Sequence, residues 1–158
     1  MSASLIFDVA PLGSLISYSD GTPKPPSRFS KKLAAWERRN GMGRLVRKVP
    51  ERERPTYTAP PSFTLHEGSF GRDDVVILTV SRTYSIDSDL YFKVVERPRI
   101  GQVRIVQTVG ESDELLHLAE SREAAELWIA KTGHRNARLE AVCPDEVGAD
   151  VVEGRAAA

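Results

Sequence analysis

The chain has 158 residues, of which 41% are hydrophobic and 28% charged, with a formal net charge of zero, as is typical of one soluble globular domain. No apolar run approaches the ~18 residues of a membrane-spanning helix, the N-terminal residues lack the features of a secretory signal, and the single cysteine, Cys143, excludes an internal disulfide. These exclusions, together with a composition rich in Arg, Ala, Glu and Val, predict a cytoplasmic protein of bacterial type.

The chain begins with two segments that favour an extended conformation. Residues 4–10 (SLIFDVA) predict a short strand with Ile6 or its neighbours on the buried face, and residues 14–19 (SLISYS) predict a second extended piece. Residues 20–27 follow with an Asp-Gly pair and three prolines, which favour a turn and resist a helix.

A helix is expected next. Ser30 is a good N-cap, and Asn40-Gly41 is a common way to end a helix through a left-handed residue. Residues 43–49 (GRLVRKV) are expected to continue as a strand. Residues 49–62 carry four prolines without apolar periodicity, which indicates a linker or an extended surface segment.

Several β-rich segments and one helix are expected in the second half of the chain. The segments cover residues 75–86, 90–97, 102–109, 115–119 and 137–142. Short loops join the first three, and the simplest arrangement of such strands is an antiparallel meander. A helix over residues 122–131 is expected to be capped by Ser121 and to stop at Gly133.

These elements predict an α+β fold, in which an antiparallel β-meander of three or more strands is covered by a helix from the C-terminal half, with a basic N-terminal β/helix segment. The predicted divisions are the basic segment 1–48, the Pro-rich linker 49–62, the α+β core 63–143 and a mobile tail 144–158.

The charges are distributed unevenly along the chain. Residues 1–56 hold 11 basic and 5 acidic side chains, whereas residues 57–158 hold 11 basic and 17 acidic ones. The basic excess is concentrated between residues 28 and 48, and its cations are Arg28, Lys31, Lys32, Arg38, Arg39, Arg44, Arg47 and Lys48. In a helix, Phe29, Leu33 and Trp36 share an apolar arc that is expected to dock on the sheet, which leaves the basic stripe facing solvent.

These eight cations are the candidate binding site, and more than one partner fits them. One interpretation is a small non-enzymatic protein that contacts the phosphates of nucleic acid without regard to sequence. The alternative is an adaptor or inhibitor that docks on an acidic protein surface, or that adds a partner strand at an exposed sheet edge. A third interpretation is that the cations form an ordinary solvated helix face, neutralised in part by the acidic half of the chain.

No catalytic residue, metal site or cofactor is predicted. The three histidines are scattered and the cysteine has no second cysteine near it, so zinc-binding spacing is absent. Neither a nucleophile elbow nor a phosphate-binding glycine loop is present. A metal-dependent enzyme is the least favoured class, and its best site would combine Asp73, Asp87, Asp89 and His66.

Overall fold

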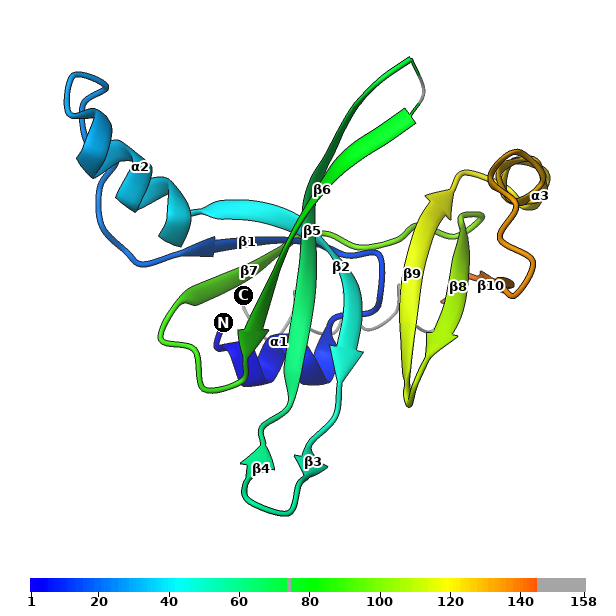
Figure 1. The fold of residues 1–158 in the computed structure, drawn as a ribbon, viewed down its shortest axis with the longest axis horizontal. Coiled ribbons are helices and arrows are strands. Elements are labelled where there is room, and N and C mark those ends of the chain that lie inside the picture. Colours follow the sequence, from blue (N-terminus) through cyan, green and yellow to red (C-terminus); the bar gives the residue numbers. More distant parts are fainter. Residues whose placement is uncertain (74, 145–158) are drawn as a thin grey trace.

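The structure is a computed structural model that describes residues 1–73 and 75–144 (Figure 1). This part of the chain contains the helices α1 (Ala3–Val9), α2 (Ser30–Arg39) and α3 (Arg122–Thr132). Its strands are β1 (Leu15–Ser19), β2 (Gly41–Val49), β3 (Arg52–Glu53), β4 (Thr58–Ala59), β5 (Ser62–Arg72), β6 (Val75–Ser85), β7 (Tyr91–Glu96), β8 (Val103–Val109), β9 (Ser112–Ala119) and β10 (Arg138–Ala141). None of the described helices is long and apolar enough to cross a membrane.

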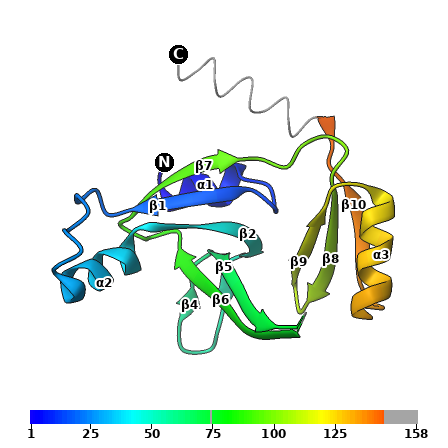
Figure 2. The same cartoon turned by 90° about the horizontal axis from the view of Figure 1, so that it is seen from above.

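Most of the strands belong to one antiparallel sheet with two wings. The first wing has the order β7-β1-β2-β5-β6, and the second has the order β2-β9-β8-β10. β2 belongs to both wings, because its first half pairs with β1 whereas Arg47, further along, pairs with Glu114 of β9. Figure 2 shows the second wing beside the first, with β9 on the side that faces the first wing and α3 on the outer side.

The α+β class, the antiparallel sheet and the packing of a C-terminal-half helix against it are confirmed. The pairing of strands 75–86, 90–97 and 102–109 differs from the expected meander, since β6 pairs with β5, β7 with β1, and β8 with β9 and β10. The consecutive antiparallel strands are instead β1, β2, β5 and β6. β6 and β7 are joined by a short loop but form the two edges of the first wing, which curves around an aromatic cluster of Phe63, Tyr84 and Phe92.

The first segment is a helix, so the strand predicted over residues 4–10 is wrong. The Ser2 hydroxyl caps α1 by accepting a hydrogen bond from the Leu5 N–H at 3.2 Å. Ala3, Ile6 and Ala10 lie on one helical face and are fully buried. A seven-residue apolar segment is compatible with both the helical and the strand period. The segment forms a helix because its apolar face then closes the core of the first wing.

Each wing has its own apolar cluster. The first is built from α1 and the first wing and contains Ala3, Ile6, Ala10, Ile16, Tyr18, Leu45, Phe63, Leu65, Leu90 and Phe92. The second contains Val103, Ile105, Ala119 and Ala125, with Trp128 and Ile129 of α3 packed against it. The ends of α3 agree with the sequence, because Ser121 caps it and Gly133 stops it at φ 77°.

The ends of α2 differ from the prediction although its position is correct. The N-cap is Phe29, which makes no side-chain capping bond, and Ser30 is already helical. Asn40 at the C-terminal end is extended, with φ −138°, and is not left-handed. Its side chain is buried at the base of the helix, so it serves as a polar anchor and the chain passes directly into β2.

The Pro-rich stretch 49–62 contains a small ribbon, in which β3 pairs with β4. The strands on its two sides, β2 and β5, are neighbours in the first wing. β5 is a long strand that is not among the elements predicted from the sequence. The mobile tail predicted over residues 144–158 lies, apart from Pro144, outside the described residues.

Candidate functional site

The predicted basic helix projects from the body of the protein (Figure 1). No residue of α2 is buried, and the Phe29 side chain is 43% exposed. The expected docking of Phe29, Leu33 and Trp36 on the sheet is therefore wrong. The indole N–H of Trp36 instead donates to the Thr22 carbonyl at 2.9 Å, so the preceding loop covers part of the apolar face.

A polar cluster anchors the base of α2 to the loop after β1. The Asn40 amide donates to the Trp36 carbonyl at 2.9 Å and to the Asp20 carboxylate at 3.1 Å. The Ser19 hydroxyl donates to the Asn40 carbonyl oxygen at 2.8 Å. Hydrogen bonds from the Thr22 side chain and backbone, then from Asn40, lower the pKa of Asp20 to about 2. Asp20 is thus an anionic acceptor throughout the neutral range.

A second contact fixes the same end of the helix from β6. The Arg82 guanidinium donates to the Arg38 carbonyl, and its Nε atom lies 3.2 Å from the Glu67 carboxylate. The Tyr18 hydroxyl also donates to Glu67. Burial, followed by the Glu67 hydrogen bond, raises the pKa of Tyr18, so the phenol keeps its proton. The helix therefore projects from a base that is held on two sides.

Four predicted cations are exposed on this helix or in the turn just before it. They are Arg28, Lys31, Lys32 and Arg38, and we call them the arm cations. The Arg28 guanidinium lies 4.8 Å and the Lys32 ammonium 5.3 Å from the centre of the Phe29 ring. No carboxylate of the described residues forms an ion pair with an arm cation. Lys24, which is not among the predicted cations, lies 5.9 Å from the Trp36 ring and adds a charge beside the helix.

The other predicted cations do not belong to this surface. Arg39 forms ion pairs with Asp20 at 3.5 Å and Asp89 at 2.9 Å, so it strengthens the base of the helix. Lys48 is packed 5.8 Å from the Phe7 ring, and burial lowers its pKa. Arg47 has a buried Nε atom without a hydrogen-bond partner in the part of the chain described. Arg44 faces a cleft between the wings.

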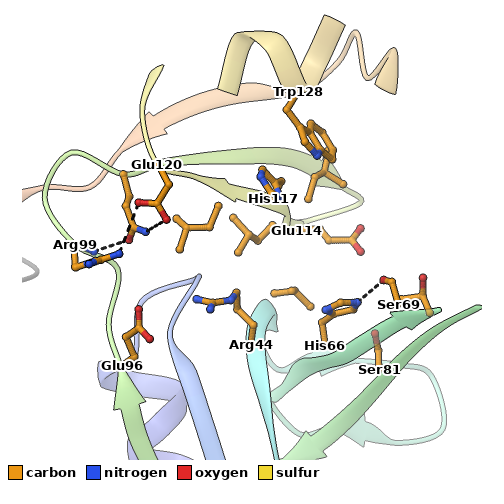
Figure 3. A pocket seen from close by; sticks show the side chains of 16 residues that line it. Arg44, His66, Ser69, Ser81, Glu96, Arg99, Glu114, His117, Glu120 and Trp128 are labelled. Carbon is orange, nitrogen blue, oxygen red and sulfur yellow. Dashed lines mark hydrogen bonds and ion pairs between the residues drawn. The ribbon is translucent and has the colours of Figure 1, made fainter. Parts of the chain in front are cut away.

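This cleft is the second candidate site, and no sequence motif predicts it (Figure 3). Its volume is about 710 Å³. Arg44, His66, Ser69, Thr79 and Ser81 line it from the first wing. The second wing contributes Glu114, Leu115, Leu116, His117, Leu118 and Trp128. Local sequence patterns do not indicate the cleft, because its walls come from strands that are distant in the sequence.

The histidines of the cleft are held by neighbours. The His66 Nε2 atom lies 2.9 Å from the Ser69 hydroxyl. His117 stacks on Trp128 with ring centres 5.2 Å apart, and His134 stacks on the same indole at 5.3 Å. Burial, and then the charge of Arg44, lowers the pKa of His117. The described residues contain no group of three or more His, Cys, Asp or Glu side chains placed to bind a metal ion.

The region that matches a known protein family includes both candidate sites. Residues 1–146 match the family described as Uncharacterised conserved protein UCP036055. The chain belongs to this family. The basic helix and the cleft both lie within the region that defines membership. No curated protein and no solved structure matches the chain.

Proposed function

We propose that this family member is a binding protein whose projecting helix contacts the phosphates of nucleic acid. The observation that carries the proposal is the set of arm cations, which are exposed on a helix anchored at its base and have no acidic partner among the described residues. Cations held in this way attract an anionic polymer without first breaking internal ion pairs.

The arrangement is suited to contact that is insensitive to base sequence. Each Lys or Arg that neutralises a phosphate releases condensed counterions, so affinity falls as salt increases. With four contacts, the logarithm of the binding constant falls with the logarithm of salt at a slope of about −3 to −4. Phe29, exposed between Arg28 and Lys32, adds an aromatic face on which an unpaired base can stack.

The test is a charge reversal at three of the arm cations, in the turn before α2 and in its first turn. The triple variant Arg28→Glu, Lys31→Glu, Lys32→Glu leaves Arg39 and Asn40 in place, so the base of the helix is unchanged. Binding to fluorescein-labelled duplex and single-stranded DNA of about 20 nucleotides is measured by anisotropy across a salt series. We expect the parent to show the slope given above and the variant to bind at least about 100-fold more weakly.

The matched control carries the same change in net charge at the other end of the molecule. It is Arg122→Glu, Lys131→Glu, Arg135→Glu, at exposed positions on or just after α3. Its affinity should stay within about threefold of the parent, because charges beyond a Debye length of ~10 Å are screened. Equal losses in the two variants, or a parent that binds neither DNA, would overturn the proposal. If the parent binds neither DNA but binds polyglutamate, and the triple helix variant does not bind polyglutamate, the helix contacts an acidic protein surface instead.

A further inference from the structure

The cleft between the wings runs along the edge of a strand. Five consecutive residues of β9, from Glu114 to Leu118, line it. Side chains of a strand alternate between its two faces, so a cavity that touches five residues in a row follows the strand's backbone edge. At about 3.4 Å per residue this edge is ~17 Å long, which is the length of a short extended peptide.

This edge of β9 has no strand beside it in the described part of the chain. β8 pairs with β9 on the other side from Val103 to Val109, with one irregularity. On the cleft side the pairing with β2 is limited to Arg47 and Glu114. Beyond that point β2 bonds to the loop before β1, because the Gly13 N–H donates to the Leu45 carbonyl and the Leu45 N–H to the Ser14 carbonyl, each at 2.8 Å. Within the described residues, the backbone donors and acceptors on the cleft side of β9 therefore have no partner strand from Leu115 onward.

The pairing with β8 has one irregularity at the same place. The register passes from His117 directly to Leu115, so Leu116 has no partner residue on β8. Such bulges are frequent at sheet edges and beside binding sites, where they redirect a side chain or end the pairing.

The wall opposite β9 is polar and uncharged along the β5–β6 hairpin. Ser69, Thr79 and Ser81 are exposed hydroxyl residues on that wall, and His66 lies beside them. Side chains of varied shape are tolerated against such a surface, whereas the strand edge recognises only the backbone of the bound segment.

Arg44 is a cationic side chain that lines the cleft. It is half-buried, and one of its amino groups donates to the Gly13 carbonyl. No carboxylate of the described residues pairs with it. Three acidic side chains among the described residues line the cleft. Glu120 is paired with Arg99 at 3.7 Å, and Glu114 accepts a hydrogen bond from Gln107 at 3.4 Å. Glu96 lies one strand away from Arg44, because Leu15 of β1 pairs with both residues, and it forms no ion pair with Arg44. Because Arg44 has no ion-pair partner within residues 1–73 and 75–144, its remaining N–H donors favour a carboxylate of a bound molecule.

We propose that the cleft binds an extended peptide segment of another protein, which pairs with β9 as an added strand and places an acidic side chain against Arg44. This interaction goes beyond the proposed nucleic-acid contact and does not depend on it, since α2 and β9 lie on opposite sides of the first wing (Figure 1).

The experiment uses the full chain and three pools of five-residue peptides. The first pool has glutamate at the centre and valine, threonine or leucine elsewhere. The second has lysine at the centre. The third repeats the first with alternate backbone amides N-methylated, which removes the donors that a strand needs. Binding is followed by NMR titration, and pairing by hydrogen exchange of the amides of residues 115–118.

We expect the glutamate pool to slow exchange of the outward-facing amides in 115–118 at least tenfold. The lysine pool should bind at least about tenfold more weakly, because a charge-assisted hydrogen bond is lost and a like charge is added. The N-methylated pool should leave exchange unchanged. Unchanged exchange with the glutamate pool, or equal binding of the methylated pool, would overturn the proposal.

Two protein variants test the anchor. Arg44→Gln should weaken binding of the glutamate pool about tenfold, and thermal unfolding shows whether the loop at Gly13 is still held. Ser81→Glu places a competing carboxylate on the exposed opposite wall and should weaken binding as much, whereas Ser27→Glu, on the loop before α2, should have no effect. If Ser81→Glu binds as the parent does, the acidic anchor is excluded. The triple variant of the helix should bind the peptides like the parent, which separates this proposal from the previous one.

Discussion

Asn40 and Asp20 determine how the basic helix leaves the sheet. The sequence predicts that the helix ends through a left-handed residue at Asn40-Gly41. In the structure the buried Asn40 amide instead joins the last turn of α2 to the loop after β1. Its burial is what changes its role, because a buried amide must find partners for all its polar atoms. Tertiary contacts also change the role of Arg39, because its guanidinium forms ion pairs with two carboxylates and is not available to the binding surface.

The low pKa of Asp20 predicts how the base of the helix responds to acid. The pKa in the folded protein, about 2, lies below the ordinary aspartate pKa of 3.8. The contribution of Asp20 is therefore complete above about pH 4 and is lost as the pH falls toward 2. The indole N–H signal of Trp36, which reports the contact with Thr22, should shift over this range in NMR spectra.

The matched variant Asp20→Asn should show the acid-like position of that signal at neutral pH and no further shift down to pH 2. A parent whose Trp36 signal does not move between pH 4 and pH 2 contradicts the argument.

The helices and strands differ in how far local sequence accounts for them. α3 has a capping serine, an amphipathic face and a left-handed glycine, and all three features act where the sequence places them. α2 has the residues of a helix, but its ends are set by contacts with the loop before it and with Arg82. α1 is too short for its period to be read, and the core that it closes decides its form.

The two helix starts give a direct comparison of capping. Ser121 accepts a hydrogen bond from the Ala124 N–H at 3.2 Å, so Ser121→Ala should lower the free energy of unfolding by about 1 kcal/mol. Ser30 makes no such bond, and Ser30→Ala should change the free energy by less than about 0.5 kcal/mol. Urea unfolding followed by circular dichroism measures both values. A larger loss for Ser30→Ala would mean that Ser30 caps the helix after all.

The two wings share one strand and further contacts, which joins their separate apolar clusters. β2 pairs with strands of both wings. The Arg104 guanidinium of β8 donates to the Leu12 carbonyl at 2.7 Å, and Gly13 lies against Leu118. These links indicate that the clusters lose their structure together, as small domains commonly do.

A pair of small core deletions tests this cooperativity. Ile16→Val in the first cluster and Ile105→Val in the second should each lower the free energy of unfolding by about 0.5–1.5 kcal/mol. Trp128 belongs to the second cluster, and in a Trp36→Phe background its fluorescence follows that cluster alone. Both variants should shift the same single Trp128 transition in urea. If Ile16→Val leaves this transition in place, the wings unfold independently.

Local patterns were sufficient for the α+β class, for the positions of α2 and α3, and for most strands, because helix caps, turn residues and β-branched runs act over a few neighbouring residues. The pairing of the strands, the helical form of α1 and the separation of the eight cations depended on the tertiary structure. The side chains that decide these features come from distant parts of the chain: Phe63 and Phe92 in the core that α1 closes, Asp89 beside Arg39, and β9 across the cleft from Arg44. Such contacts bring together residues whose spacing in the sequence carries no period, so only the folded chain reveals them.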